Sequence, residues 1–233
     1  MTPRIALSTP QFAVFAAIVA STAILHTAAH AETGAQRWHV GRHYRELPPR
    51  SAEYDHSRVR VVEFFLYSCP HCNALQPLLR SWDKRRPGHV SLVYVPIIWG
   101  RNSAGDAKLF YTLQFLDRLD LHQSVYDTIH IQHKPLSAPF DVQSTELIQR
   151  SWLATKGVSP EAFKRAYSSP EVSARLSLAK ELDMTYQITE SPSLVVGGRY
   201  VTDPRRVTDN EELIELLDFL VSKVVVENHI RPQ

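Results

Sequence analysis

The residues of this 233-residue chain best suited to chemistry are its two cysteines, which stand three positions apart in Cys69-Pro70-His71-Cys72. A cysteine attacks a disulfide as the thiolate, so an exchange catalyst needs one cysteine whose charged form is both stabilised and accessible. A second cysteine one helical turn later can reach the first sulfur and release a mixed disulfide formed there. The tetrad therefore predicts a redox-active dithiol.

Other uses of a cysteine pair fit this tetrad less well. Covalent haem attachment needs a histidine directly after the second cysteine, where this chain has Asn73. A structural zinc site needs four ligands, and no second ligand cluster follows to complete a set begun by Cys69, Cys72 and His71. A disulfide that closes so short a loop stabilises little through chain entropy. We therefore expect redox catalysis, with no metal site and no bound cofactor.

The segments on either side of the tetrad indicate how it is positioned. Residues 59–67 form a β-branched and aromatic run, typical of a strand buried on both faces. Residues 73–86 carry apolar side chains at helical spacing, which predicts a helix kinked at Pro77. A second strand is predicted over 90–98. This βαβ unit places Cys69 at a strand-to-helix junction, where unpaired N–H groups and the helix dipole favour an anion.

The two residues between the cysteines suit the same site. Pro70 is well placed in a first helical turn, because that position needs no backbone N–H. His71 can add a cation or a hydrogen-bond donor near the thiolate.

The region 100–187 is predicted to be entirely helical, because its apolar residues recur at helical spacing and no convincing strand interrupts them. Predicted helices cover 107–119 and 123–132, and three more begin at the capping residues Ser144, Ser159 and Ser169. Phe110, Tyr111 and Phe115 are expected in the core. Three histidines of this region have no ligand-like cluster of acids around them and are expected on the surface: His122, His130 and His133.

The segments before residue 59 and after residue 187 also have predicted secondary structure, weakly indicated in the first and clearly in the second. An edge strand is expected near 38–44. Residues 193–196 and 199–201 predict a hairpin turned by Gly197-Gly198. A capping box of Thr208 with Glu211 then opens a last helix.

The N-terminal segment 1–31 predicts export. It has one arginine, no acidic residue, an apolar stretch over 12–25 and a small-x-small site ending at Ala31, which together are typical of a cleaved signal peptide. This stretch of fourteen residues, interrupted by Ser21 and Thr22, is too short to span a bilayer about 30 Å thick. We expect cleavage after Ala31. Because the removed segment holds one arginine, the formal net charge falls from +2 to +1, and this balance predicts no nucleic-acid partner. A single cysteine pair in an oxidising compartment is unlike ordinary structural cross-linking.

Two motifs resemble the DsbA family, exported thiol:disulfide oxidoreductases of the thioredoxin superfamily. Residues 63–72, Glu-Phe-Phe-Leu-Tyr-Ser-Cys-Pro-His-Cys, resemble the family's active-site segment. Residues 191–200, Ser-Pro-Ser-Leu-Val-Val-Gly-Gly-Arg-Tyr, resemble its cis-proline loop and the hairpin that follows. Residues 41–44 are similar to its N-terminal edge.

The resemblance implies an α/β fold class, namely a thioredoxin fold with an inserted all-helical lobe. The expected parts are a signal peptide over 1–31, the two parts of the thioredoxin-like domain over 32–99 and 188–233, and the inserted lobe over 100–187.

The resemblance also implies roles for single residues. Cys69 is the exposed nucleophile and Cys72 the buried resolving cysteine. Pro192 is the cis-proline, and the backbone of Ser191 pairs with an extended substrate peptide, although this position holds valine or threonine in other members. Glu63, flanked by apolar neighbours, is the buried acid that exchanges protons with Cys72.

The activity implied is oxidation of newly exported, unfolded cysteine-containing proteins by a periplasmic monomer. A DsbB-type, quinone-coupled membrane oxidase would reoxidise it. The resemblance also implies a stabilised Cys69 thiolate, which favours the reduced enzyme. Two alternatives stay open. One is a disulfide isomerase or reductase, although the segment 32–58 leaves no room for a dimerisation region. The other is a peptide-binding chaperone that keeps the fold.

Overall fold

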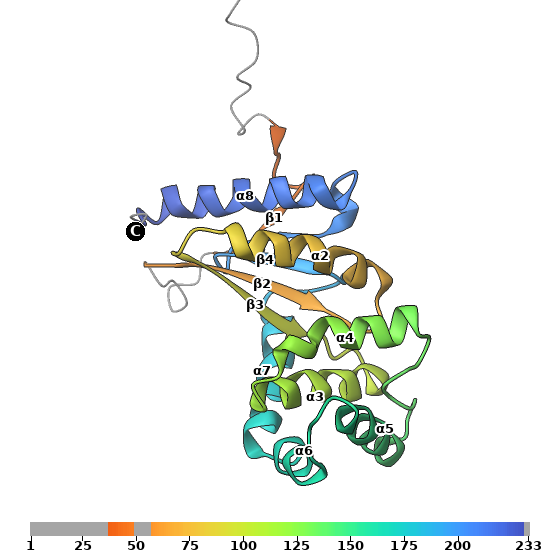
Figure 1. Cartoon of the computed structure of the whole chain (residues 1–233). Coiled ribbons are helices and arrows are strands. Elements are labelled where there is room, and N and C mark those ends of the chain that lie inside the picture. Colours follow the sequence, from red (N-terminus) through yellow and green to blue (C-terminus); the bar gives the residue numbers. More distant parts are fainter. Residues whose placement is uncertain (1–36, 49–56, 231–233) are drawn as a thin grey trace, which may run out of the picture. The chain divides into compact units, whose positions relative to one another are not determined.

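The computed structural model describes residues 37–48 and 57–230, and the predicted signal peptide 1–31 lies outside them (Figure 1). From Trp38 onward the chain forms one compact unit. Its strands are β1 (Arg45–Glu46), β2 (Val59–Phe65), β3 (Val90–Pro96), β4 (Ser193–Val196) and β5 (Tyr200–Thr202). Its helices are α2 (Pro70–Arg85), α3 (Arg101–Phe115), α4 (His122–Tyr126), α5 (Val142–Ala154), α6 (Pro160–Tyr167), α7 (Pro170–Thr185) and α8 (Asn210–Glu227). Two 3-10 turns (Leu119–Leu121 and Pro204–Arg206) and a π-helix, η2 (Asp127–Ile131), complete the order.

The five strands form one mixed sheet in the order β1-β5-β4-β2-β3. β2 runs parallel to β3, with Val59 opposite Val90, and antiparallel to β4, with Glu63 opposite Leu194. The predicted βαβ unit and the predicted hairpin are therefore both confirmed. The end of β2 pairs with the beginning of the antiparallel strand β4, so the turn after Phe65 and the loop before Ser193 lie side by side at the same end of these strands.

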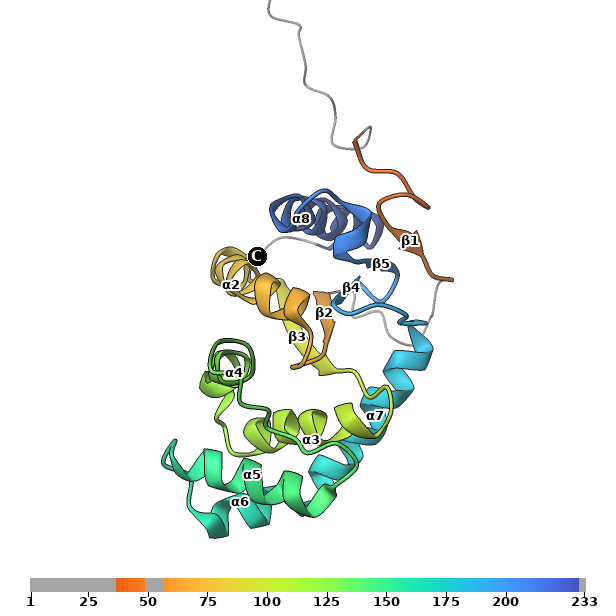
Figure 2. The same cartoon turned by 90° about the vertical axis from the view of Figure 1, so that its right-hand side faces the viewer.

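One face of the sheet is covered by α2 and α8, which lie together in both views (Figures 1 and 2). The apolar residues of α2 pack there with the predicted face of α8, namely Leu213, Leu217, Leu220 and Val224. On the strands, alternate residues such as Val59 and Val61 point into this layer. The active-site helix is thus fixed along its length by a continuous apolar contact.

The opposite face of the sheet and the end of β2 meet the helices that run from α3 to α7 (Figure 2). Val62 and Phe64 of β2 belong to this second core, together with Phe110 and Tyr111 of α3. The prediction that the region is helical is confirmed, and Phe115 alone of the three aromatics expected in the core is exposed. No helix within 37–48 or 57–230 is long and apolar enough to cross a membrane.

The predicted edge strand is misplaced by a few residues, whereas two of the predicted helix caps are confirmed. The edge strand is β1, just after the predicted 38–44, where only an isolated bridge forms between Val40 and Tyr44. Ser159 and Ser169 cap their helices as predicted.

Two predicted caps shift instead to a nearby aspartate. Asp141 caps α5 by accepting from the Ser144 N–H, and Asp209 caps α8 by accepting from the Glu212 N–H. In both places two side chains of capping type stand close together, and local sequence does not distinguish them.

Candidate active site

Cys69 stands at the junction between β2 and the active-site helix α2, as predicted. It is the N-cap of α2, with extended backbone angles, and Pro70 occupies the first helical position. The Cys69 N–H donates to the Leu66 carbonyl at 3.1 Å, and the Cys69 carbonyl accepts from the Asn73 N–H at 3.1 Å. Cys69 is partly exposed and Cys72 is fully buried, and both are free thiols.

The surroundings of Cys69 favour its thiolate. Its pKa falls from the ordinary value to about 5, chiefly because the Cys72 thiol hydrogen-bonds to its sulfur. The backbone N–H groups of Cys72 and His71 lower the pKa further, as expected where a helix begins, while burial opposes them. The pKa of Cys72 is raised, first by its burial and then by its bond to Cys69. The two sulfurs therefore differ in both accessibility and charge.

The loop that precedes β4 meets both sulfurs. The Ser191–Pro192 peptide bond is cis, as the resemblance implies. The Cys69 thiol donates to the Ser191 carbonyl at 3.3 Å, and the Ser191 hydroxyl lies 3.2 Å from the Cys72 sulfur. Residues 122 positions apart in sequence thus form one site.

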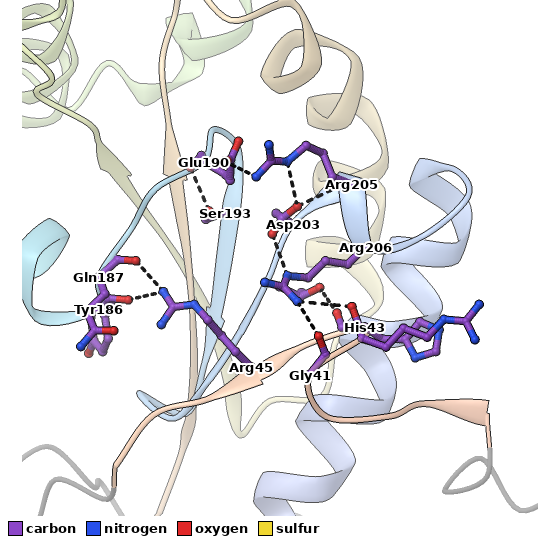
Figure 3. A network of polar contacts seen from close by, with 12 residues as sticks. Gly41, His43, Arg45, Tyr186, Gln187, Glu190, Ser193, Asp203, Arg205 and Arg206 are labelled. Carbon is purple, nitrogen blue, oxygen red and sulfur yellow. Dashed lines mark hydrogen bonds and ion pairs between the residues drawn. The ribbon is translucent and has the colours of Figure 1, made fainter.

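Charged residues join the ends of this loop to the segment that follows β5, as Figure 3 shows. Glu190, directly before Ser191, forms an ion pair with Arg205, and its carbonyl accepts from the Ser193 hydroxyl at 2.8 Å. Asp203 is buried and accepts from the Arg205 N–H and from the Arg206 side chain. Arg205 therefore contacts this loop directly through Glu190, whereas Arg206 bonds to Asp203 in the neighbouring segment.

A second clamp fixes the chain where α7 ends and leads to this loop. Arg45 of β1 donates to the carbonyl oxygens of Tyr186 and Gln187 at 2.5 and 2.6 Å (Figure 3). Gln187 has a φ of 52°, in the left-handed region. The N-terminal edge strand thereby anchors the return from the helical region to the sheet.

Glu63 lies in the interior beneath the dithiol, as predicted. It has no exposed surface, and its Oε2 accepts from the Gln76 side chain of α2 at 2.7 Å. Burial raises its pKa from 4.5 to about 8, against the effect of the Gln76 bond. Its Oε1 and the Oε1 of Gln76 have no hydrogen-bond partner among the described residues. Glu63 is therefore a carboxyl group that can hold or release a proton close to neutral pH.

A cavity of about 800 Å³ opens beside the dithiol. His71, Ser191 and Pro192 form one side of it, and the loop at Pro204 and Arg205 with the start of α8 forms the other. His71 is exposed at its edge.

Some residues near the site were not expected from the sequence. Gln76 follows Cys72 by one helical turn, so its shared face could have been inferred from spacing. The prediction that His122 is a surface residue is wrong, because it is buried and its Nδ1 lies 2.7 Å from the Tyr67 hydroxyl oxygen. His130 is partly buried, and only His133 is exposed as predicted. Among the described residues no group of three or more histidines, cysteines or acids gathers as metal ligands do.

Known proteins similar to this chain agree on one family. No family model matches the chain. The thiol:disulfide interchange protein DsbA of Pseudomonas aeruginosa is 31% identical over 211 residues, which cover 90% of this chain and 95% of that protein. DsbA of Bordetella parapertussis is 34% identical over 189 residues, covering 81% and 84% respectively.

Solved structures give the same answer for the fold. The crystal structure of P. aeruginosa DsbA matches with a TM-score of 0.74 and 32% identity, over 83% of this chain and 97% of that one. The oxidoreductase DsbA from Xylella fastidiosa matches with a TM-score of 0.68 and 27% identity, over 79% and 96%. These matches confirm the predicted thioredoxin fold with its helical insertion. With identities above 30% across most of both chains, the protein belongs to the DsbA family of disulfide-forming thiol:disulfide oxidoreductases.

Proposed function

We propose that this protein, exported to the periplasm, oxidises cysteine pairs in newly exported, unfolded proteins. The observation that carries the proposal is the contrast between the two sulfurs. The partly exposed Cys69 has a pKa lowered to about 5, whereas Cys72 is buried and has a raised pKa. Groups that stabilise the Cys69 thiolate stabilise the reduced enzyme, and so favour transfer of the disulfide to a substrate.

The reaction begins from the Cys69–Cys72 disulfide. A substrate thiolate attacks the Cys69 sulfur, forms a mixed disulfide and displaces Cys72. The second substrate thiolate then attacks the substrate sulfur of the mixed disulfide and releases Cys69 as a thiolate. The substrate loses two electrons and gains a disulfide, and the enzyme gains both electrons as a dithiol.

Cys72 leaves as a thiolate in the interior, where its charge is unfavourable. Glu63 is placed beneath the dithiol with a pKa of about 8, so its protonated form is available at neutral pH to supply a proton toward Cys72. In the reverse half of the cycle the same carboxylate takes the proton back.

Substrate binding is assigned to the loop at Ser191 and Pro192 and to the cavity beside it. The backbone of Ser191 faces the sulfurs and offers strand-like hydrogen bonds to an extended peptide. The catalytic cycle closes when a DsbB-type membrane oxidase takes the two electrons of the dithiol and passes them to a quinone. The protein acts as a monomer.

The test adds the oxidised protein to an unfolded, reduced protein with two cysteines and follows loss of the substrate's thiols. Wild type should oxidise one substrate per enzyme, and neither Cys69→Ala nor Cys72→Ala should oxidise any, because neither variant can form the enzyme's own disulfide. When Cys72→Ala is mixed instead with the oxidised substrate, its Cys69 thiolate should attack the substrate disulfide and accumulate as a mixed disulfide, because Cys72 is not there to release it. The surface variant His133→Gln is the matched control and should behave as wild type.

Two further assays separate the alternatives. An isomerase would restore the activity of a substrate with scrambled disulfides faster than this protein oxidises thiols. A chaperone would protect an aggregating protein equally well after Cys69→Ala. Either result would contradict the proposed function.

A further inference from the structure

Tyr67, in the turn between β2 and the dithiol, is held from the helical region at two points. It is buried and stands two residues before Cys69. Its hydroxyl oxygen lies 2.7 Å from Nδ1 of His122 in α4. Its backbone carbonyl lies 2.8 Å from Nε2 of His130 in η2. A carbonyl oxygen only accepts, so Nε2 of His130 carries the proton and donates it.

The π-helix η2 explains how one continuous helical segment contacts both the hydroxyl and the backbone carbonyl of Tyr67. The two histidines are eight positions apart, and in a regular α-helix their side chains would point about 80° apart. The wider turn of η2 changes this angle, and its backbone bonds run over five residues, as from the Gln132 N–H to the Asp127 carbonyl. Interruptions of this kind are often found at functional sites. Thr128 in the same turn is buried and accepts from the Trp152 side chain, which fixes η2 to α5.

Packing makes the His122 contact rigid. The imidazole lies among the rings of Phe65, Tyr94, Phe110 and Tyr126, with ring centroids 4.9 to 5.6 Å away. Burial lowers the pKa of His122 to about 3, so the ring is neutral near pH 7. The contact therefore does not depend on pH near neutrality.

The Tyr67 carbonyl belongs to the turn that sets the position of Cys69. Only Ser68 separates the two residues, and the Cys69 N–H closes the turn on Leu66. The Cys69 sulfur is stabilised by N–H groups at the start of α2, whose effect depends on distance and direction. A small movement of the turn therefore moves the sulfur relative to these donors.

We propose that His130, supported by His122, is a positioning residue through which the inserted helical lobe holds the Tyr67 turn and so keeps Cys69 aligned with its N–H donors. The inference rests on the proposed role of Cys69 as the nucleophile. It gives the helical lobe a part in the chemistry of the dithiol besides its part in the fold.

The test replaces His130 with leucine, which removes the donor, and with glutamine, which keeps an N–H donor on a side chain of similar reach. Thiolate absorbance of the reduced protein gives the pKa of Cys69, and equilibrium with glutathione gives the stability of its disulfide. His130→Leu should raise the pKa of Cys69 by about half a unit to one unit, which corresponds to the loss of one ordinary hydrogen bond from an N–H group to the thiolate. His130→Gln should stay closer to wild type, and His133→Gln should not differ from it.

Two results would overturn the inference. One is a lower melting temperature for His130→Leu with an unchanged pKa and glutathione equilibrium, because that would show a merely structural role. The other is an equal shift in the glutamine variant. If the leucine variant does not fold, His130→Ala provides the same comparison with a smaller side chain. Failure of the proposed function itself would appear separately, as oxidation that survives Cys69→Ala.

Discussion

Glu63→Gln is expected to stabilise the oxidised protein, although it removes a residue assigned to the reaction. Glu63 is fully buried, and burial raises the pKa of its carboxyl group from 4.5 to about 8. The folded protein therefore binds a proton that the unfolded chain releases, and its stability falls as the pH rises between these two values. The loss is about 5 kcal/mol over the whole interval and about 3 kcal/mol at about pH 7, from 1.36 kcal/mol per pKa unit.

In Glu63→Gln the amide does not titrate, so the loss of folding stability with rising pH disappears, and the amide can form one more hydrogen bond. Its oxygen can still accept from Gln76, and its N–H can donate to the Oε1 of Gln76, which lacks a partner among the residues described. In the oxidised protein no Cys69 thiolate is present, so the opposite pH dependence of that group does not enter. Its contribution to the Glu63 pKa is lost as well, but burial, the largest cause of the raised pKa, remains.

The measurement is urea unfolding of the oxidised protein between about pH 4.5 and about pH 8, the interval set by the two pKa values. Wild type should lose stability steadily across the interval, while Glu63→Gln should be nearly constant and about 3 kcal/mol more stable at about pH 7. The exposed Glu181→Gln in α7 is the matched control and should follow wild type. A variant no more stable than wild type at that pH, or one that keeps the wild-type slope, would refute the account of Glu63.

Three other outcomes are expected. In the reduced protein, alkylation of Cys69 should remain fast until the pH falls to about 5, and a midpoint near that of an ordinary thiol would contradict the thiolate assignment. Gly197→Ala should lower the free energy of unfolding by about 1–2 kcal/mol, because Gly197 has a φ of 57° and a Cβ there would lie 2.8 Å from the Val224 methyl groups; Gly88→Ala, with open space around it, should have little effect. Asp209→Ala should cost about 1 kcal/mol in urea unfolding if this residue is the cap of α8.

The parts of the site that could be predicted from sequence depend on local rules. A strand followed directly by a helix fixes the position of Cys69, and a lone acid in an apolar strand indicates that Glu63 is buried. The position of the Ser191–Pro192 loop beside the dithiol can be predicted only from a family motif, because no local rule connects segments so far apart.

The parts that could not be predicted depend on tertiary packing. His122 and His130 have no sequence feature that distinguishes them from the exposed His133. Their contacts with Tyr67 arise only when α4 and η2 meet the end of β2, and the π-helix that aligns them has no recognised signature in this sequence. The ion pair of Glu190 with Arg205 likewise joins two loops that only the hairpin brings together.

The most direct test of the central claim is the reduction potential of the Cys69–Cys72 pair, measured by equilibration with glutathione. The stabilised Cys69 thiolate favours the reduced dithiol over the disulfide. This predicts a reduction potential clearly less negative than the value of about −270 mV typical of thioredoxin. A potential at or below that value would identify a reductant and contradict the proposal that this protein gives its disulfide to exported substrates.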